Sequence, residues 1–513
     1  MAIVRSTFNK LAGLVRFAVR ARRLIDDRIT LDQAADAIRA GVEQREKRFL
    51  AMLTRAIVSN PLSPYRRLMS CAGCEPGDIA GLVEREGLEG ALATLAQAGV
   101  HVTYDEFKGR SPAIRGSQTF RFQPDDFDDP LARRFFAAST GGTRGAPTRV
   151  PIDAALISEM TPYWMMFLAE HGCVDAPLVF WAPGHAGVAA RYLSCARGGR
   201  IYAEWFVSAG MRSLKDRVYS AGIHWLARRA GPFPRPRRAS FSEPQPVLDH
   251  LRAELAAGRT PCVNTTPSAA VKLSAVAQTR GVPLAGITFL LGSEPLTPAR
   301  RRAIEASGAR AAPLYGSTEA PWIGGQCRHA RTPDEVHVFA DSYAIVPIGE
   351  TMRLTSLRYA LPKVLLNVDI GDRATLETGR CGCSYDRLGC RLRLHTIRSA
   401  DKITEFGVTF ALHDVFHVLE DLLPARLGGS AGDYQLVEER DGRGLARYTI
   451  LLNPALPPID DARVPDAFLS EIARLRDYYG VMASIWQRER LVGVQRGPAI
   501  AGASGKILPF ARR

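Results

Sequence analysis

Nine residues at 140–148, TGGTRGAPT, have the composition of a phosphate-binding loop. Glycine lets the backbone approach a ligand closely and expose its N–H groups to it. Thr140, Thr143 and Thr148 add hydroxyl groups, and Arg144 adds a fixed positive charge. The loop therefore predicts polyphosphate binding. It matches neither the GxxxxGK[ST] nor the GxGxxG pattern, and a sequence of this kind also forms ordinary turns.

Three more short motifs follow the loop along the chain. Tyr315-Gly316-Ser317-Thr318-Glu319 comes after an apolar run, Gly371-Asp372 lies within DIGDRATLE, and Ser504-Gly505-Lys506-Ile507 lies near the end of the sequence. Each is weak alone, because GD pairs often cap turns, and Glu319 and Lys506 could be solvated surface residues. Their order and separation make the set specific.

On these motifs the chain resembles the adenylate-forming superfamily of acyl-CoA synthetases and related ligases. Within it the phenylacetate–CoA ligase branch, with the related acyl-protein synthetases, is the most similar. The resemblance runs from about residue 60 to the end and is most specific at 266–320, TPSAAVKL to PLYGSTEA. It implies an AMP-forming acid–thiol ligase. An aromatic or medium apolar carboxylic acid would attack ATP–Mg²⁺ to give an acyl-adenylate, and CoA or the phosphopantetheine of a carrier protein would then take the acyl group.

The resemblance also implies a role for each motif residue. The loop would cradle the β- and γ-phosphates through Thr140, Gly141, Gly142, Thr143, Arg144 and Gly145, with Thr143 as its catalytic hydroxyl. The nucleotide would further meet Gly292, Ser293, Glu294, Tyr315, Gly316, Ser317 and Thr318. Glu319 would hold Mg²⁺, Asp372 the ribose hydroxyls, and Arg398 would approach the nucleotide from the hinge. Lys506 would stabilise charge developing on the α-phosphate.

Several positions depart from the family pattern. Gly141, Arg144 and Thr148 stand where Ser, Thr and Lys are usual, and Ala400 replaces the usual acid at the domain pivot. Two alternatives therefore remain open at this point. The chain could deliver its adenylate to an amine or a protein nucleophile, or it could be a catalytically degenerate scaffold.

Two short chelating pairs predict a structural zinc site. They are Cys327 with His329 and Cys381 with Cys383, and four Cys or His ligands suit tetrahedral zinc. Members of the phenylacetate branch often carry similar segments. Buried free thiols are the alternative, and Cys390 or His337 could replace one ligand. The nine cysteines do not form the framework of a disulfide-rich domain, which favours a reducing, cytoplasmic compartment.

The hydrophobic pattern predicts an α/β fold. Residues 30–110 have helical periodicity, and from about 135 short apolar runs alternate with helical segments, which is typical of a parallel sheet with crossover helices. We expect 1–110 to be a helical N-terminal segment of a large domain whose adenylate-forming core, with parallel and mixed sheets, is 111–396. A helix–strand–strand–helix order predicts a small, mobile α+β lid at 397–513.

Charge and hydropathy limit the partners. The net charge of +15 is spread along the chain as Arg, without a nucleic-acid-binding motif, and no apolar run approaches the length of a membrane span. Residues 1–25 predict an amphipathic helix that docks on protein or lies on a membrane surface. Residues 228–246, rich in proline and arginine, predict an exposed loop. The sequence leaves open whether the protein forms a homodimer. Six aromatic residues are candidates for the acyl pocket or simply for the core: Trp164, Phe180, Trp181, Trp205, Phe206 and Trp322.

Overall fold

The structure is a computed structural model that describes residues 19, 22–132, 136–139, 149–152, 154–182, 187–200, 202–208, 234–241, 243–348, 351–399, 402–429, 432–476, 479–500 and 509–513. Three predicted features therefore lie outside the described residues. They are the loop at 140–148, the pivot positions Ala400 and Asp401, and Lys506. Residues 1–18 of the expected N-terminal amphipathic helix also lie outside the described residues. Residues 22–26 are described and are helical.

Helices form the N-terminal segment, as the periodicity predicts. They are α2 (Leu31–Glu43), α3 (Arg45–Met52), the π-helical turn η1 (Leu53–Val58), α4 (Pro64–Cys71), α5 (Pro76–Gln97) and α6 (Tyr104–Phe107). Thr30 begins α2 with a capping box, because its hydroxyl accepts from Gln33 N and the Gln33 side chain accepts from Thr30 N. Short pieces follow: β1 (Ala113–Arg115), β2 (Gln118–Phe120), η2 (Pro124–Phe127), β3 (Phe136–Ser139) and β4 (Arg149–Ile152).

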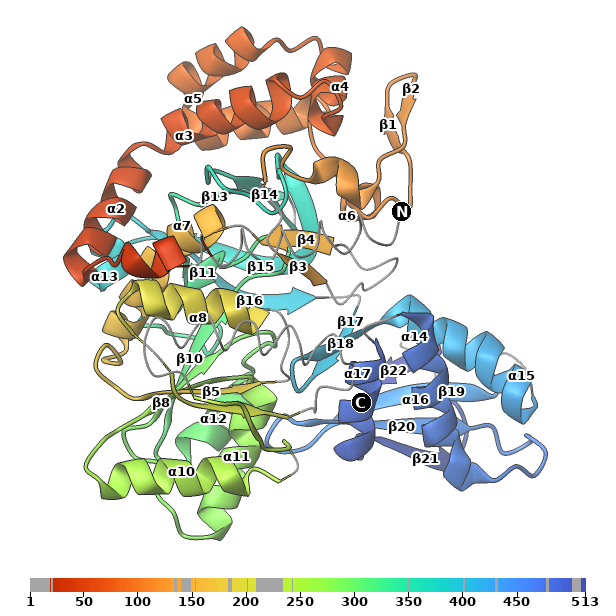
Figure 1. The fold of residues 1–513 in the computed structure, drawn as a ribbon. Helices are drawn as coiled ribbons and strands as arrows, with labels where there is room; N and C mark the ends of the chain where they lie inside the picture. Colours follow the sequence, from red (N-terminus) through yellow and green to blue (C-terminus); the bar gives the residue numbers. More distant parts are fainter. Residues whose placement is uncertain are drawn as a thin grey trace, which may run out of the picture.

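A parallel half-sheet begins after helix α7 (Ala154–Glu170). Its strands lie in the order β7-β6-β5-β8-β9-β10, and every neighbouring pair is parallel. The strands are β5 (Leu178–Ala182), β6 (Tyr202–Val207), β7 (Arg237–Arg238), β8 (Cys262–Thr265), β9 (Thr288–Leu291) and β10 (Arg310–Tyr315). Connecting helices are α8 (Gly187–Arg197), α10 (Gln245–Ala256), α11 (Pro267–Thr279) and α12 (Pro298–Glu305). The alternation of strands and helices confirms the predicted α/β class (Figure 1).

Antiparallel strands continue the same sheet beyond β10, giving twelve strands among the described residues. The order runs β10-β11-β12-β16-β15-β14-β13. The elements are β11 (Gly324–Gly325), β12 (Val336–Val338), β13 (Tyr343–Ile348), β14 (Thr351–Ser356), β15 (Val368–Thr378), helix α13 (Ser384–Arg387) and β16 (Leu392–Ser399). The sheet is therefore mixed, with its parallel part at one end.

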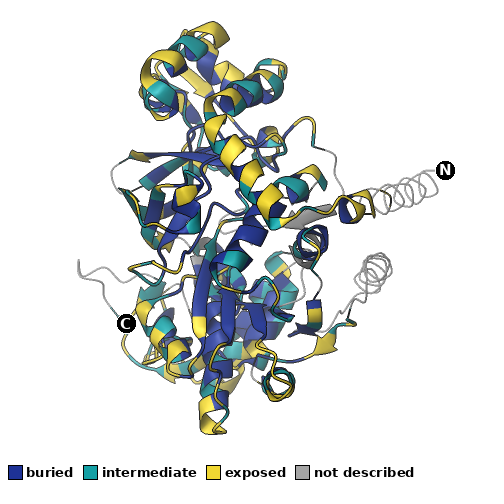
Figure 2. Cartoon of the chain, turned by 90° about the vertical axis from the view of Figure 1, so that its left-hand side faces the viewer, coloured by how far each residue is buried: buried dark blue, intermediate teal, exposed yellow. Residues whose placement is uncertain are grey.

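Apolar side chains of the parallel strands alternate between two cores, because neighbouring residues of a strand face opposite sides of a sheet. On β5, Val179 and Trp181 pack with α10, α11 and α12, whereas Leu178 and Phe180 pack with α7 and α8. A third core joins α3, α4 and α5 to the antiparallel strands. Buried residues consequently follow the central strands, and the helices expose only their outer faces (Figure 2).

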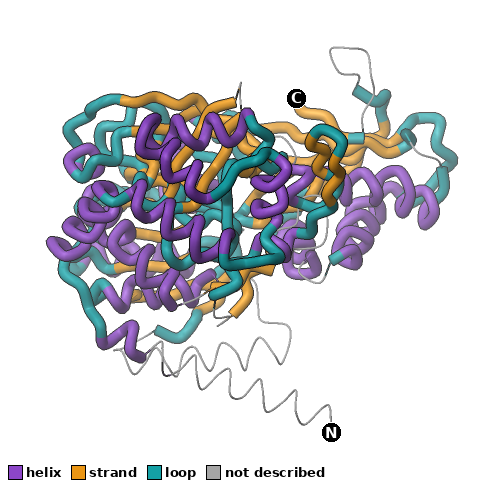
Figure 3. The backbone as a smooth tube through the Cα atoms, turned by 90° about the horizontal axis from the view of Figure 1, so that it is seen from above, coloured by secondary structure: helices purple, strands orange, loops and turns teal. Residues whose placement is uncertain are grey.

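A C-terminal unit, residues 402–513, carries its own four-stranded sheet in the order β21-β20-β19-β22. Its elements are β17 (Lys402–Glu405), β18 (Val408–Ala411), α14 (Leu412–His417), η3 (Val418–Leu422), α15 (Leu423–Leu427), β19 (Tyr434–Arg440), β20 (Ala446–Leu452), η4 (Asp461–Arg463), α16 (Val464–Leu475), α17 (Tyr479–Arg488), β21 (Val492–Arg496) and β22 (Phe510–Arg512). The unit stands beside the main body (Figures 1 and 3) and has the predicted helix–strand–strand–helix order.

The segment 228–246 is not the wholly exposed loop that its proline and arginine content predicts. In its described part, Arg237–Arg238 form the edge strand β7, and Phe241 is fully buried. The Phe241 ring stacks on Phe406 of the C-terminal unit with ring centroids 5.4 Å apart. The hydrophobic effect of one aromatic side chain therefore outweighs the polar composition around it.

Candidate functional site

Candidate nucleotide-binding residues gather at the carboxyl edge of the parallel strands. Strands β8, β9 and β10 are parallel neighbours, so their carboxyl ends share one edge of the sheet. Gly292, Ser293 and Glu294 follow β9 directly, and Tyr315 is the last residue of β10. Ser293 has a φ of 72°, in the left-handed region, which turns the chain sharply after the strand. This edge is where open α/β sheets bind ligands.

Tyr315 and Asp372 meet across the sheet. The Tyr315 hydroxyl donates to Asp372 Oδ2 at 2.8 Å, and Asp372 belongs to β15. Burial, and then the Asp372 carboxylate, raise the pKa of Tyr315 well above its usual value, so the hydroxyl stays protonated and can donate. Gly371 has a φ of 79°, and a Cβ atom there would lie 3.0 Å from the Tyr104 ring. Glycine is therefore required where the chain passes Tyr104.

The motif 315–319 continues into a tight loop. Ile323 N donates to the Tyr315 carbonyl at 2.8 Å, and Ala320 N donates to Ser317 Oγ at 3.0 Å. A Cβ atom on Gly316 would lie 2.5 Å from the backbone nitrogen of Trp322, so only glycine fits. Thr318 is half-buried in the same loop.

Glu319 is paired with a cation that sequence reasoning missed. Its carboxylate forms an ion pair with Lys108 Nζ, and the side chains of Glu319 and Lys108 are only 10% and 11% exposed. Lys108 directly follows α6, and its ammonium group lies 5.3 Å from the centre of the Phe107 ring. No motif marks Lys108 in the sequence, since the two paired residues are 211 positions apart. A positive charge already compensates the carboxylate at the position predicted for Mg²⁺.

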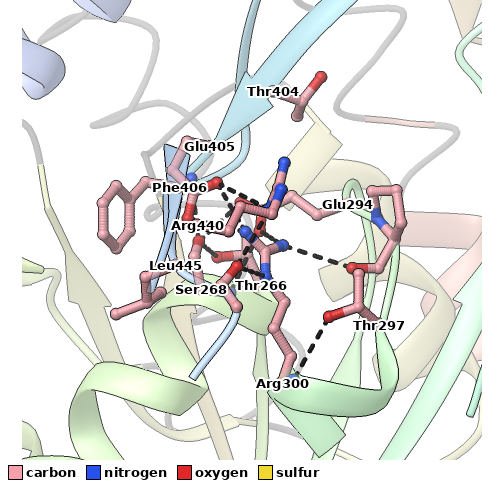
Figure 4. Close-up of polar contacts among 12 residues, drawn as sticks. Thr266, Ser268, Glu294, Thr297, Arg300, Thr404, Glu405, Phe406, Arg440 and Leu445 are labelled. Carbon is pink, nitrogen blue, oxygen red and sulfur yellow. Dashed lines mark hydrogen bonds and ion pairs between the residues drawn. The ribbon is translucent and has the colours of Figure 1, made fainter. Parts of the chain in front are cut away.

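Glu294 is turned toward the C-terminal unit. Its side chain is fully buried, and it accepts hydrogen bonds from Arg300 at 2.8 Å and from the Ser268 hydroxyl at 2.8 Å. Gly407 N, in the turn between β17 and β18, donates to the same carboxylate. Arg300 also bonds Glu405, as Figure 4 shows. In this conformation the carboxylate is held by protein groups, and only the backbone near Glu294 is left to border a nucleotide.

Arg398 lies on β16 and bonds Asp334 Oδ2 at 3.0 Å. Its side chain is half exposed, and Asp334 also accepts from the backbone of Thr396 and Ile397. The predicted hinge arginine is thus anchored to the main body just before the C-terminal unit begins.

The two predicted phosphate-contacting segments can be located only by the residues that flank them. Strands β3 and β4 pair antiparallel, with Ser139 opposite Arg149, so residues 140–148 connect the two strands of a hairpin. On the other side, Ile500 N donates to the Gln435 side chain, and Leu436 N donates to the Pro509 carbonyl. The ends of 501–508, which contains Lys506, therefore attach to neighbouring positions of β19.

Three cysteines and one histidine form a compact chelating cluster. One ligand atom each from Cys327, His337, Cys381 and Cys383 lies within 4.8 Å of the others. His337 Nε2 is 3.3 Å from Cys381 Sγ and 3.5 Å from Cys383 Sγ. His337 Nδ1 lies 2.6 Å from the Cys390 carbonyl, so with the proton on Nδ1 the lone pair of Nε2 faces the sulfur atoms. The donor set and its size fit tetrahedral zinc.

The structure places His337, the alternative considered from the sequence, beside the three cysteines, and not His329. His329 Nδ1 contacts the Cys381 carbonyl oxygen at 2.8 Å, and His329 is not in the cluster. The reason is strand pairing, because β11 and β12 place Gly325 opposite His337 and carry His337 back toward Cys327. The short spacing between Cys327 and His329 does not predict this strand pairing.

The six candidate acyl-pocket aromatics do not form one group. Trp181 and Phe206 are fully buried in the core beneath α10, α11 and α12. The others belong to the opposite core with α7 and α8: Trp164, Phe180, Trp205 and Trp322. On β5 and β6, strand alternation places Trp181 and Phe206 on one face of the sheet and Phe180 and Trp205 on the other.

No protein-family model and no curated protein matches the chain. Solved structures give distant likenesses. A malonyl-CoA ligase ternary product complex with methylmalonyl-CoA and AMP is 14% identical, with 85% of this chain and 94% of that chain covered and a TM-score of 0.43. An NRPS protein containing adenylation and PCP domains is 14% identical (78% and 62% covered, TM-score 0.41). Anthranilate CoA ligase with anthranoyl-AMP is 13% identical (81% and 73%, TM-score 0.34).

The helices were compared with the length and hydropathy of a membrane span. Within the described residues, none of them combines the length and the apolar character that crossing a bilayer needs.

Proposed function

We propose that the protein is an AMP-forming carboxylate ligase. The acid's carboxylate oxygen would attack the α-phosphorus of ATP, and pyrophosphate would leave. A thiol of CoA or of a carrier protein would then attack the acyl carbon, and AMP would leave. The observation that carries the proposal is the meeting of Tyr315, Asp372 and the Glu319 loop around one edge of the parallel strands, in residues of the order that the family resemblance assigns.

Each residue has a role that its chemistry supports. Asp372 accepts one hydrogen bond from Tyr315 through Oδ2, and a carboxylate can accept further bonds from a ribose diol. Glu319 offers the hard oxygen ligand that Mg²⁺ prefers, and the Lys108 ammonium group is the cation that Mg²⁺ would replace. Mg²⁺ would supply charge neutralisation on the phosphates. Thr318 and the 140–148 loop would bind phosphate oxygens, and Lys506 would act at the α-phosphate.

We also propose that Cys327, His337, Cys381 and Cys383 hold a structural zinc ion. Structural zinc sites are closed by four protein ligands, and this cluster supplies four. Cys383 also caps α13, since Asp386 N donates to its sulfur atom at 3.4 Å. The ion would tie the β11–β12 pair to the segment between β15 and β16.

An ATP–pyrophosphate exchange screen over aromatic and aliphatic acids tests the ligase proposal. We expect exchange that depends on the acid and on Mg²⁺. Asp372→Asn should lower it by about 100-fold or more, because a ribose-binding carboxylate is lost. Glu377→Gln is the matched control on the same strand, and its exposed side chain should leave exchange unchanged. Exchange that is insensitive to Asp372→Asn, or absent with every acid, would contradict the proposal.

The acceptor is tested by adding nucleophiles to an enzyme that shows exchange. Release of AMP on adding CoA or a phosphopantetheinylated carrier protein would support the thiol ligase. Release of AMP only with an amine would favour the alternative adenylate-forming enzyme.

A further inference from the structure

Arg191, on helix α8, lies between two tryptophan rings. Its guanidinium carbon is 4.8 Å from the ring centre of Trp164 and 4.8 Å from that of Trp322. The two ring centres are 5.7 Å apart, and the rings are inclined by 40°. Cation–π contacts of this kind orient a guanidinium group, and they leave its N–H edges able to bond an acceptor.

The charge of Arg191 has no acid to balance it within the described part of the chain. Its Nη1 atom is buried there without a hydrogen-bond partner. Burial lowers the pKa of the guanidinium group, and only Tyr202 and Cys195 oppose that effect. Both of these groups are neutral at pH 7, since burial raises their pKa values.

Two fully buried arginines have acidic partners, whereas the buried Arg358 donates to the backbone carbonyls of Pro321 and Trp322. Arg300 bonds two glutamates, and Arg393 bonds Glu335 at 3.2 Å. Arg191 is partly buried as a residue, but its Nη1 atom is buried, and a buried charge that lacks a counter-ion is costly. An anion that is not part of the protein would supply the missing partner for Arg191.

Arg191 is close to the proposed reaction site. Trp322 is three residues beyond Glu319 and closes the loop in which Gly316 faces the Trp322 backbone. Helix α8 itself follows β5, so its N-terminal half lies at the carboxyl edge that carries Tyr315. The guanidinium group therefore stands on the acyl side of the site, among aromatic rings that would contact the body of an acid.

We propose that Arg191 binds a second anionic group of the acid substrate, so that the enzyme activates a dicarboxylic acid or another acid with an anionic substituent. This inference rests on the proposed ligase function and narrows its substrate class, in contrast to the neutral aromatic or medium apolar acid expected from sequence. The reacting carboxylate is a poor ligand for Arg191, because a bidentate pair would stabilise the ground state and weaken the nucleophile. A remote carboxylate has no such conflict.

Matched pairs of acids test the proposal in ATP–pyrophosphate exchange. The pairs are adipate with hexanoate, and 4-carboxyphenylacetate with phenylacetate, so that each differs mainly in one carboxylate. We expect the wild type to favour the diacid of at least one pair by about tenfold or more in kcat/KM. Arg191→Met should remove this preference, and Arg191→Lys should keep part of it. Arg39→Met, an exposed arginine paired with Asp36, is the control and should change nothing.

Equal use of both members of each pair by the wild type would overturn the inference and leave the ligase proposal standing. If Arg191→Met lowered kcat/KM equally for mono- and dicarboxylic acids, the inference would also be overturned, because an equal loss would indicate a structural role for Arg191.

Direct binding separates the two proposals. Isothermal titration of the wild type with the same diacids, with and without AMP, should show binding that weakens about tenfold or more in Arg191→Met. Binding of this kind without exchange on any acid would support the anion site and contradict the ligase function. Absence of both binding and exchange would overturn both.

Discussion

Arg300 on α12 donates two hydrogen bonds to Glu405 at the end of β17, at 2.7 and 2.6 Å (Figure 4). The two side chains are at most 1% exposed, and Arg300 also bonds Glu294. Arg300 further donates to the carbonyl of Gly444, in the β19–β20 turn, at 3.0 Å. One guanidinium group therefore joins the main body to two separate turns of the C-terminal unit.

Arg300→Met should destabilise the protein by about 3–5 kcal/mol, because it removes the counter-ion of the buried Glu294 and leaves Glu405 only the longer contact with Arg440, at 3.9 Å. Chemical denaturation measures this change. The neighbouring Arg301 is a matched control, since its pair with Glu305 is partly exposed. Arg301→Met should lower the free energy of unfolding by at most about 1 kcal/mol. Equal effects of the two substitutions would contradict a special role for the buried group.

Stability should fall as pH rises through the range in which Glu405 ionises in the folded protein. Burial raises the pKa of Glu405 from 4.5 to about 7, although Arg300 opposes this effect. The folded state therefore holds the Glu405 proton more tightly than the unfolded state, and this contribution is lost between about pH 4.5 and 7. Glu405→Gln should reduce the fall in unfolding free energy by on the order of 1–3 kcal/mol.

Denaturation of the wild type and Glu405→Gln at pH 5 and pH 8 provides the comparison. Glu439→Gln removes a carboxylate whose side chain is 43% exposed, and it should retain the wild-type pH dependence. An unaltered pH dependence in Glu405→Gln would show that this carboxyl does not control the effect.

Metal content should depend on His337 and not on His329. We expect about one zinc ion per chain, bound by the cluster of three cysteines and His337. His337→Ala should lose the ion and lower the melting temperature, whereas His329→Ala should keep both at wild-type values. Elemental analysis and thermal denaturation measure these outcomes. Purified protein without zinc, or metal lost equally in the two variants, would refute the site.

Lys108 and Glu319 should have opposite effects on the use of Mg²⁺. Glu319→Gln removes a ligand oxygen and should raise the Mg²⁺ concentration for half-maximal exchange by about tenfold. Lys108→Met removes the ammonium group that pairs with Glu319, and it should lower the Mg²⁺ concentration for half-maximal exchange. Titration of the exchange rate against Mg²⁺ measures both shifts. Shifts of the same sign in the two variants would be inconsistent with competition between Mg²⁺ and Lys108 for the Glu319 carboxylate.

Lys506→Ala should abolish acid-dependent release of pyrophosphate, because the charge on the α-phosphate loses its cation. Formation of thioester from preformed acyl-adenylate should remain, since that half-reaction does not need the same group. The two half-reactions are assayed separately with the same protein preparation. Full adenylation by this variant would remove the assignment.

Local patterns were sufficient to predict most of the elements. The alternation of short apolar runs and helical segments expected from about residue 135 is observed, for example as β8 with α11 and β9 with α12, because an apolar strand followed by a helical period is recorded in neighbouring residues. The two strands expected within the C-terminal unit are β19 and β20, which pair antiparallel.

Pairings between distant residues could not be predicted in this way. Lys108 with Glu319, Arg300 with Glu405, and His337 in place of His329 all depend on which strands and turns become neighbours. The spacing of residues in the sequence does not tell which strands and turns become neighbours, because the burial of whole helix and sheet faces decides which elements pack together.

The sequence by itself determined the α/β class, the motif order and the candidate residues, because these depend on local periodicity and residue type. Only the tertiary structure decided which charges are compensated. It gives Glu319 and Arg300 partners, and among the described residues it leaves Arg191 between two rings without an acid. The physical reason is that the cost of a buried charge depends on groups brought together by packing, however far apart they lie in the chain.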